Sequence, residues 1–385
     1  MRQSTDLFSD FSGAANPCVR PLRALIRLSS FKKNIATIKK NIANSELIIV
    51  VKADAYGHGL VEIAQAAGGA SLAVAIPEEL RILREAGLDN QVWVLEGPFS
   101  LECLAHSDNV IWVIHSFWQV SLIRQAIEQG IVSDLNICIK LDTGMHRLGF
   151  VESELSELVD LLEQLSPLIL HATMTHFAMS DQADQESVLN QLARFDQLVC
   201  SYKLSHIKQT LANSGGVMMY PESHRDWVRP GIMLFSGESS SSDYIALEPV
   251  MSFESAIISL RSVKNGEFVG YGAGWVAEKD SIIATVAVGY ADGYPRHAPN
   301  GTPVAIIGKH DGEIHVASLA GRVSMDMITV DVSLIDHVAI GDKVELWGKT
   351  IAEGIVRGNW ACYLSSFIIL NSLLKLKDVF SLLKK

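Results

Sequence analysis

Eight short apolar runs alternate with segments of helical periodicity between Leu47 and Phe235, and this alternation restricts the fold more than any other feature of the chain. The intervening segments, such as PEELRILREAGL (77–88), carry apolar residues three and four positions apart, as amphipathic helices do. Continuous apolar strands separated by such helices predict a parallel sheet covered by helices, and eight of them predict a closed (β/α)8 barrel. The runs are Leu47–Val51, Ser71–Ile76, Val92–Leu95, Val110–Ile114, Leu135–Leu141, Leu168–Met174, Ile207–Leu211 and Ile232–Phe235.

The pattern changes after the low-complexity segment SGESSSSD, Ser236 to Asp243. From Pro249 onward the chain consists of short β-rich runs separated by turn residues, such as SIIATVAVGY and KVELWG. A chain of 385 residues is long enough for two domains. We therefore predict an N-terminal extension at residues 1–20, a barrel domain at 21–245 and a C-terminal mainly β domain at 246–385.

Charge and cysteine content favour small molecules as partners. The formal net charge of -11 and the isoelectric point near 5.5 argue against nucleic acid, because phosphate binding needs clustered Lys and Arg in excess. The five cysteines are scattered without a CxxC pair, so we expect neither a disulfide framework nor a metal site.

The sequence also favours a cytoplasmic location. The amino end has no continuous apolar segment of the kind that a secretory signal needs. The apolar stretch ACYLSSFIILNSLLKL (361–376) falls short of the roughly 20 residues that span a bilayer, so no membrane association is expected.

One lysine stands directly after the first apolar run. In a (β/α)8 barrel the active site lies at the carboxyl ends of the strands, and Lys52 in VVKADAYGHG (50–59) would enter the barrel mouth. A lysine that extends from a buried strand to solvent is the commoner explanation for a single residue of this kind. A desolvated lysine, however, has a lowered pKa and a free amine that can bond to an aldehyde cofactor or act as a base.

Basic side chains also follow the fifth and sixth runs. KLDTGMHRLGF (140–150) places Lys140 and Arg147 in one strand-to-helix connection, where an ordinary charged loop is the simplest explanation. An arginine there could instead hold a substrate carboxylate through two parallel hydrogen bonds. MTHFA (174–178) places His176 at the same end of the barrel, although an isolated histidine is more often structural.

The last two barrel segments could form a phosphate site. LANSGG (211–216) offers the hydroxyl of Ser214 at a predicted helix start, and DWVRPGIMLF (226–235) offers Arg229 and the backbone amides of Gly231 and Ile232. Barrels often bind a phosphate in their last loops, against the amino end of a helix. Each element is weak alone, and their joint placement at strand ends is what favours a site.

Two glycine-containing segments of the second domain are further candidates. FVGYGAGW (268–275) encloses Tyr271 between glycines, and GRVSMDM (321–327) contains Met325. Turn geometry alone explains most of these glycines. A loop this flexible can also be inserted into another site.

Together these motifs resemble alanine racemase, a family of pyridoxal 5'-phosphate enzymes built from a barrel and a β domain. The resemblance is collinear from about Pro21 to Trp347, and the order of so many motifs makes it specific. The motifs are VVKADAYGHG, KLDTGMHRLGF, MTHFA, LANSGG, WVRPGIML, GYGAGW, AVGYADGYPR and GRVSMDM.

The resemblance implies a catalytic pair. Lys52 corresponds to the lysine that bonds covalently to the cofactor and acts as the base toward D-alanine. Tyr271 corresponds to the base toward L-alanine, which in this family reaches the cofactor of the partner subunit, so the family implies a homodimer with shared active sites. Arg147 corresponds to the residue that holds the substrate carboxylate, with help from the backbone of Met325 of the partner chain.

The resemblance also implies the contacts of the cofactor. Arg229 corresponds to the arginine that faces the pyridine nitrogen, and His176 to the imidazole near the ring. Lys140 lies where some members carry a carbamylated lysine that orients the arginine. The residues that correspond to phosphate contacts are Tyr56, Ser214, Gly231 and Ile232.

The chemistry agrees with this assignment. Racemisation removes the α-proton from one face of the substrate and returns a proton to the other, so two bases must flank the α-carbon.

A racemase of broader specificity, for example toward serine, is an alternative. A non-catalytic barrel that only binds pyridoxal phosphate, or a decarboxylase with a related barrel, is disfavoured because the motifs of Tyr271 and Met325 are present. The favoured role is the supply of D-alanine for peptidoglycan.

Overall fold

The computed structural model describes residues 20–132, 134–165, 168–182, 185–236, 245–309 and 312–351, which form two compact units. The barrel unit contains Lys32–Leu234 together with residues 245–247. The β unit contains residues 20–31, 235–236 and 248–351. Most of the predicted N-terminal extension and the apolar stretch 361–376 lie outside the described residues.

The barrel unit is a closed barrel of eight parallel strands, which confirms the predicted fold class. Neighbouring strands pair in chain order, and the last strand pairs with the first through Glu46 with Trp227 and Leu47 with Val228. The strands are β2 (Glu46–Val50), β3 (Ser71–Val74), β4 (Val92–Val94), β5 (Val110–Ile114), β6 (Leu135–Lys140), β7 (Leu168–Met174), β8 (Lys208–Thr210) and β9 (Trp227–Val228).

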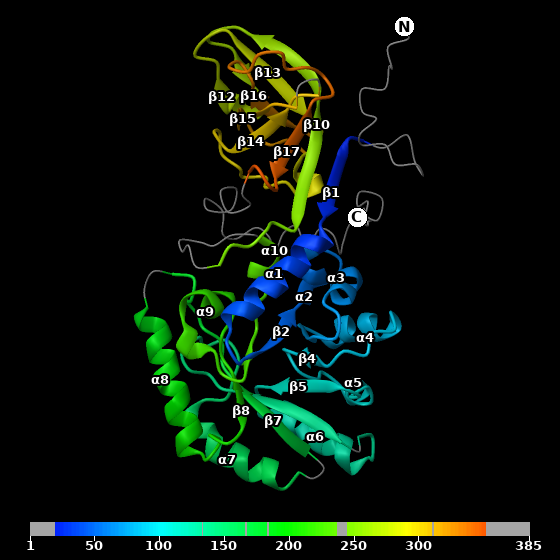
Figure 1. Ribbon diagram of the computed structural model, residues 1–385, viewed down its shortest axis with the longest axis vertical. Coiled ribbons are helices and arrows are strands. Elements are labelled where there is room, and N and C mark those ends of the chain that lie inside the picture. The colour runs from blue at the N-terminus through cyan, green and yellow to red at the C-terminus, as the bar shows by residue number, and fades with distance from the viewer. Residues whose placement is uncertain are drawn as a thin grey trace. The chain divides into compact units, whose positions relative to one another are not determined.

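Helices occupy the connections between the strands and surround the barrel (Figure 1). An amphipathic face explains them: in α4, for example, Leu80 and Leu83 are buried while the helix also carries exposed charges. The helices are α1 (Leu28–Asn41), α2 (Lys52–Gly57), α3 (Leu60–Ala66), α4 (Pro77–Glu85), α5 (Leu101–Leu104), α6 (Phe117–Glu128), α7 (Glu152–Glu163), α8 (Glu186–Ser201), α9 (Ser214–Met219) and α10 (Met233–Ser236), with a short 3-10 turn at Pro221–Ser223.

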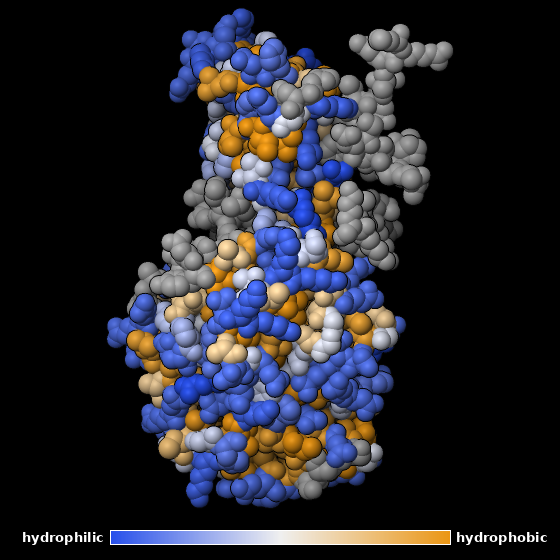
Figure 2. Space-filling view, viewed as in Figure 1, coloured by the Kyte–Doolittle hydropathy of each residue, from blue (hydrophilic) through white to orange (hydrophobic). Residues whose placement is uncertain are grey.

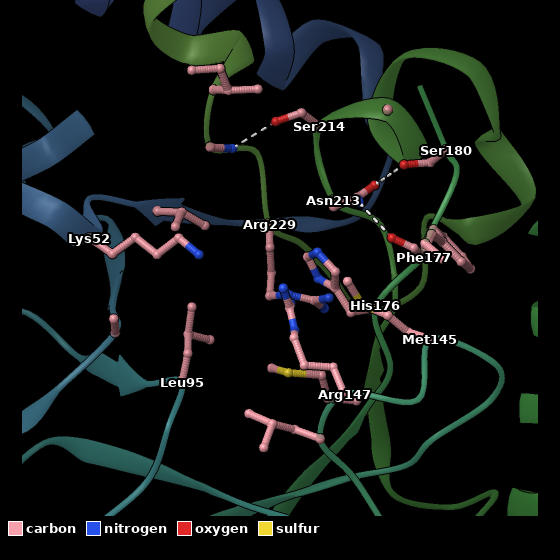
Figure 3. Close-up of a pocket in the computed structure, with 18 of the residues that line it drawn as sticks. Lys52, Leu95, Met145, Arg147, His176, Phe177, Ser180, Asn213, Ser214 and Arg229 are labelled. Atoms are coloured by element: carbon pink, nitrogen blue, oxygen red, sulfur yellow. Dashed lines mark hydrogen bonds between the residues drawn. The ribbon is translucent and has the colours of Figure 1, made fainter. Parts of the chain in front are cut away.

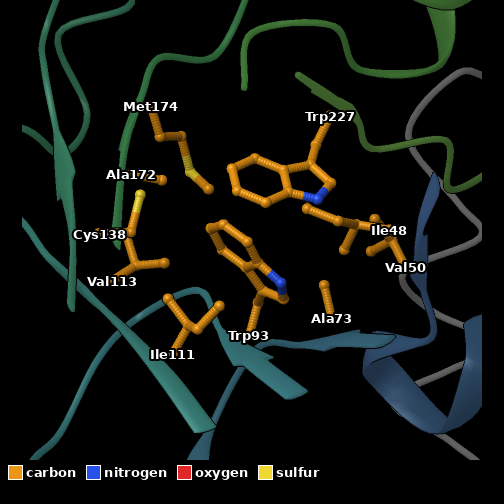
Figure 4. Packing of buried hydrophobic residues seen from close by; sticks show 10 residues of the cluster. All are labelled: Ile48, Val50, Ala73, Trp93, Ile111, Val113, Cys138, Ala172, Met174 and Trp227. Carbon is orange, nitrogen blue, oxygen red and sulfur yellow. The ribbon is translucent and has the colours of Figure 1, made fainter. Parts of the chain in front are cut away.

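Large apolar side chains fill the barrel interior. Trp93 and Trp227 meet edge to face with ring centroids 5.3 Å apart, and Ile48, Val113 and Met174 pack around them (Figure 4). Strands such as β5 are apolar and buried at every position because helices cover their outer side, and this explains why they appear in the sequence as continuous apolar runs, whereas β8 (Lys208–Thr210) is polar and partly exposed. The same packing fixes the strand ends that carry the polar residues of the mouth.

The prediction of the eighth strand was wrong. Ile232–Phe235 was expected to be a strand, but the eighth strand is Trp227–Val228, and Met233–Ser236 forms α10. Pro230 ends the strand because it has no backbone N–H and a fixed φ. Met233, Leu234 and Phe235 are buried, so their apolar character comes from helix packing.

The β unit is built on a seven-stranded antiparallel sheet, with the strand order β1-β10-β13-β16-β15-β14-β17 and a further pairing of β10 with β17. These strands confirm the predicted mainly β domain. They are β1 (Leu22–Ile26), β10 (Met251–Val263), β13 (Ser281–Val286), β14 (Pro303–Ile307), β15 (Ile314–Leu319), β16 (Ile328–Asp331) and β17 (Lys343–Trp347), with a small hairpin of β11 (Phe268–Val269) and β12 (Trp275–Val276).

One strand of this sheet comes from the start of the described chain. β1 pairs antiparallel with β10 from Leu22 opposite Ser255 to Ile26 opposite Met251. The predicted barrel range of 21–245 included this strand, whereas in the structure it belongs to the β unit. A five-residue alternating strand gives no signal of its partner, because pairing over such a distance is not encoded in local periodicity.

Hydrophilic side chains cover much of the visible surface, with apolar side chains in patches between them (Figure 2). Among the described residues, the helices are all too short or too polar to cross a bilayer.

Candidate active site

A cavity of about 540 Å³ opens at the carboxyl ends of the barrel strands. Its size is typical of small-molecule sites. Figure 3 shows Lys52 extending from the β2 side toward the part of the cavity that carries Arg229 and His176. Nine of the predicted site residues line this barrel-mouth cavity: Lys52, Tyr56, Lys140, Arg147, His176, Ser214, Arg229, Gly231 and Ile232.

The chain takes an unusual path directly after Lys52. Ala53, Asp54, Ala55 and Tyr56 have φ values between 52° and 55°, a left-handed turn made without glycine. Such a conformation costs on the order of 1–2 kcal/mol for each residue with a Cβ atom, so tertiary contacts must hold it. We call this segment the Lys52 turn. It brings the side chain of Tyr56 into the same cavity as Lys52.

The amine of Lys52 is poised to lose its proton more easily than an ordinary lysine. Burial, and then the positive charge of Arg147, lower its pKa, while the carboxylates of Glu96 and Glu79 oppose this shift. A lowered pKa increases the fraction of free amine at neutral pH, and the free amine is the form that bonds to an aldehyde or accepts a proton.

The loop that carries Arg147 is fixed by Asp142. The Oδ1 atom of Asp142 accepts hydrogen bonds from the N–H groups of Gly144 at 3.0 Å and His146 at 3.1 Å, and its Oδ2 atom lies 3.0 Å from Nδ1 of His146. The neighbouring Thr143 bonds to Thr175 at 2.8 Å. The arginine at the rim of the cavity is therefore held on an ordered loop.

Lys140 lines the same cavity and is buried, with 8% of its surface exposed. Burial, Arg229 and Arg147 lower its pKa to about 8. Two cationic neighbours and a dry environment make a charged ammonium unfavourable at this position. The amine is therefore partly neutral near physiological pH.

Arg229 is anchored by three hydrogen bonds. Its Nη1 atom donates to Oγ1 of Thr210 at 2.6 Å, and its Nη2 atom donates to the carbonyls of Thr175 at 2.6 Å and Leu211 at 3.1 Å. Burial lowers its pKa to about 10, so it stays protonated at neutral pH. Burial lowers the pKa of His176 to about 2, and the nearby cations, Arg229 first among them, lower it in the same direction. Its imidazole is therefore neutral.

Backbone donors converge on Ser214 at one side of the cavity. The N–H groups of Gly231 and Met233 donate to its Oγ atom at 3.0 and 3.4 Å. A Cβ atom at residue 231 would overlap the hydroxyl of Tyr56, so glycine is needed for the close approach. The hydroxyl of Ser214 and the backbone of Gly231 and Ile232 line the cavity together with its basic residues, and such groups fit the phosphate of pyridoxal phosphate, with Lys52 in the same cavity for the aldehyde.

Replacing Gly231 with alanine is expected to lower the free energy of unfolding by about 1–3 kcal/mol and to weaken cofactor binding, because the added methyl group displaces Tyr56. Urea denaturation and a titration with pyridoxal phosphate measure the two effects. Gly69→Ala is the matched control, since nothing lies within 4 Å of a Cβ atom at that residue and its φ is not positive. Equal results for the two variants would contradict the prediction.

The other two predicted residues, Tyr271 and Met325, lie in the β unit. Tyr271 begins the 3-10 turn Tyr271–Ala273 between β11 and β12 and is 71% exposed, and Met325 is 54% exposed. Their loops approach each other, because Cβ atoms at Gly270, Gly272 and Gly274 would all lie near Arg322.

The Met325 loop is held by its neighbours in the β unit. The N–H of Ala291, in the 3-10 turn Tyr290–Asp292, donates to the carbonyl of Met325 at 2.9 Å. A Cβ atom at Gly289 would overlap that carbonyl. The β unit thus gathers three of the quoted motifs, AVGYADGYPR, GYGAGW and GRVSMDM.

Sequence reasoning missed two acidic residues near Lys52. Glu96 lines the cavity, and Glu79 is buried with its carboxylate against the Lys52 turn. Glu79 lies in an ordinary amphipathic helix pattern, so no local signal distinguishes it from the exposed Glu78. Among the described residues, no group of three His, Cys, Asp or Glu side chains could hold a metal ion.

Known proteins match this chain over nearly its whole length. The family descriptions "Alanine racemase, N-terminal domain" and "Alanine racemase, C-terminal domain" match residues 26–239 and 250–367. An alanine racemase of Hahella chejuensis is 40% identical over 88% of this chain and 92% of its own. A catabolic alanine racemase of Pseudomonas putida is 38% identical over 86% of this chain and 92% of its own.

Solved structures agree. The biosynthetic alanine racemase of Pseudomonas aeruginosa superposes with a TM-score of 0.84 at 37% identity, covering 94% of this chain and 99% of that one. The alanine racemase of Bartonella henselae with covalently bound pyridoxal phosphate superposes with a TM-score of 0.81 at 28% identity, covering 91% and 97%.

The barrel has a desolvated lysine at its mouth, and the chain matches these relatives over most of its length. These two findings define a pyridoxal-phosphate-dependent isomerase of amino acids. The family confirms the resemblance seen in the sequence motifs. The chain belongs to the alanine racemase family.

Proposed function

We propose that the protein interconverts L-alanine and D-alanine with Lys52 and Tyr271 as the two bases. The observation that carries this proposal is the placement of Lys52 after β2, in a cavity with Arg147 and with a lowered pKa. The proposal is supported by the relatives named above, which are alanine racemases.

The cofactor and the protein divide the chemistry. Bound pyridoxal phosphate supplies an aldehyde that bonds to amines and an electron-withdrawing ring that acidifies the α-C–H of the substrate. The neutral amine of Lys52 accepts the α-proton on one face of the substrate or returns it there. The phenol of Tyr271 does the same on the other face, and two such groups are needed because one side chain cannot reach both faces.

The remaining residues orient the reactants. Arg147 holds the substrate carboxylate, and the backbone of Met325 assists it from the partner chain. Arg229 would face the pyridine nitrogen of the bound cofactor, and it keeps its own proton because its pKa is still about 10. His176, which is neutral, would provide an uncharged imidazole next to the bound ring. Phosphate contacts come from Tyr56, Ser214, Gly231 and Ile232.

A homodimer with shared active sites is part of the proposal. It is supported by the exposure of Tyr271 and Met325 in the β unit, where 71% and 54% of their surfaces are accessible. A catalytic phenol that is exposed on its own unit is free to reach a cofactor bound in a second copy. The partner's Tyr271 would then complete the barrel-mouth cavity that contains Lys52.

The function is tested by a racemisation assay with L-alanine and, separately, L-serine as substrates, followed by chiral chromatography of the products. We expect D-alanine to form with a kcat/KM well above that for serine. Faster conversion of serine would replace the proposal with a serine racemase, and conversion of neither would leave only a cofactor-binding barrel.

Carbamylation of Lys140 is a further part of the proposal. A carbamate would replace a disfavoured cation beside Arg147 and Arg229 with an anion, and the pKa of about 8 leaves enough neutral amine to react with CO2. Carbon-13 NMR with labelled bicarbonate near pH 8 should show a carbamate resonance that Lys140→Arg removes. Lys140→Ala should raise KM for alanine roughly tenfold through a less ordered Arg147. A spectrum without the resonance would reject the modification.

We also propose that the enzyme acts in the cytoplasm and supplies D-alanine for peptidoglycan. Relatives include both a biosynthetic and a catabolic alanine racemase, so the direction of use is a separate question from the activity. Disrupting the gene in its own host should produce a requirement for D-alanine. Growth without D-alanine, combined with failure to use it as a nutrient, would favour the catabolic role.

A further inference from the structure

The Lys52 turn is connected to its surroundings through one buried carboxylate. Glu79 is the third residue of α4 and is 9% exposed. Its Oε1 atom accepts a hydrogen bond from the N–H of Ala53, the residue directly after Lys52, and its Oε2 atom accepts one from the N–H of Ala75 at 2.8 Å. One side chain therefore joins the backbone beyond β2 to the backbone beyond β3.

These two strands are neighbours in the barrel wall. β2 and β3 pair in parallel, with Val50 opposite Ala73, and both end at the mouth. The carboxylate thus fixes the start of the Lys52 turn relative to the rigid sheet. The next residue of the turn joins it to the start of α3, because Oδ1 of Asp54 accepts a hydrogen bond from the N–H of Leu60 at 2.7 Å. A left-handed segment without glycine persists only where contacts of this kind determine it.

We propose that Glu79 is a positioning residue for Lys52, and that its two hydrogen bonds hold the left-handed turn that aims the amine into the barrel-mouth cavity. This inference rests on the proposed function only in that the cofactor bonds to Lys52. Glu79 itself does not touch the reacting atoms.

Charge gives Glu79 a second, separable effect. The amine of Lys52 is surrounded by charged and titratable groups from several elements, and the carboxylates of Glu79 and Glu96 oppose the effects of burial and of Arg147 on its pKa. Removing the charge of Glu79 should lower this pKa further. Among the described residues, the titratable and charged groups that face the cavity or the turn include Asp54, Tyr56, His58, Glu62, Glu79, Glu96, Lys140, Arg147, His176, Asp181 and Arg229.

The test compares Glu79→Gln and Glu79→Ala with the wild type in the full-length chain. The first readout is the rate at which the chain, freed of cofactor, bonds covalently to added pyridoxal phosphate, measured by borohydride reduction and mass spectrometry of the peptide that contains Lys52. We expect this rate to fall roughly 10- to 100-fold in Glu79→Ala and less in Glu79→Gln, whose amide oxygen can still accept one hydrogen bond. In Glu79→Gln the pH profile of the rate should also shift to lower pH.

The second readout is kinetic. We expect kcat for alanine to fall with a much smaller change in KM, because Arg147 and its loop are held independently by Asp142. The matched control is Glu78→Gln, which removes an exposed carboxylate from the same helix turn and should leave both readouts unchanged.

The outcomes separate this inference from the proposed function. If Glu79→Gln folds and bonds to the cofactor at the wild-type rate and with the wild-type pH profile, the inference is wrong, even if its melting temperature falls. If Glu79→Ala does not fold, Glu79→Gln alone decides, since it is nearly isosteric. If the wild type bonds to the cofactor but does not racemise alanine, the proposed function fails while the bonding rates still test Glu79.

Discussion

Replacing Lys52 with alanine should lower kcat/KM for the racemisation of alanine on the order of 10⁴-fold or more. The variant loses the group proposed to bond to the cofactor and one of the two proposed bases, and acid–base catalysis alone contributes about 10²–10⁴-fold. The cofactor should still bind through the contacts proposed for its phosphate and ring, but without a covalent bond. Borohydride reduction followed by mass spectrometry should therefore find no modified peptide.

Lys40→Ala provides the control for this variant. Lys40 is an exposed lysine at the end of α1, so its removal should leave both activity and the modified peptide unchanged. Attachment of the cofactor to Lys140 in the Lys52→Ala chain, with substantial activity, would contradict the assignment of Lys52. Lys140 is the relevant competitor because it lines the same cavity and also has a lowered pKa.

Mixing two inactive chains should restore activity if the proposed dimer is correct. A heterodimer of a Lys52→Ala chain and a Tyr271→Phe chain has one site in which Lys52 and the partner's Tyr271 are both intact, and one site in which both are missing. Random exchange of equal amounts makes about half of the dimers mixed, so about a quarter of the wild-type activity should appear. Each variant alone should remain nearly inactive.

The matched experiment places both substitutions in one chain and mixes it with wild type. With shared sites, each mixed dimer has one substitution in each of its two sites, so only wild-type dimers remain active, and an equal mixture has about a quarter of the activity of the same total amount of wild-type protein. If each chain instead contains its own complete site, the mixture has about half of the activity of that amount of wild-type protein, and the two single variants never complement. The pair of experiments therefore distinguishes the two arrangements without a structure of the dimer.

Much of the fold could be predicted from the sequence, because a strand that is buried on both faces has apolar residues at consecutive positions. Strands such as Val110–Ile114 are apolar at every position, and the helices between them carry their apolar residues at regular spacing. Strand β9 could not be found this way, since two residues before a proline are too few to form a pattern. The partner of β1 was hidden because pairing with β10 spans more than the barrel itself.

The candidate site shows the same division. Lys52, Arg147 and Arg229 follow apolar runs, so the rule that barrel sites form at strand ends selects them, and the structure places all three in one cavity. Glu79 acts through the backbone of the Lys52 turn, and neither its residue type nor its position in the helix pattern predicts this contact. The left-handed Lys52 turn was equally hidden, since its two alanines and its tyrosine disfavour that conformation and a single aspartate is too common a residue to indicate it.

The pairing of β1 with β10 has a consequence for how the chain folds. The two strands are separated in sequence by all the strands of the barrel, so the sheet of the β unit cannot close until the ribosome has completed most of the chain. The barrel can form earlier, while β1 is still unpaired because β10 has not yet been synthesised. We therefore expect the surface that bears Tyr271 to fold last, so the proposed dimer would assemble only after both barrels are complete.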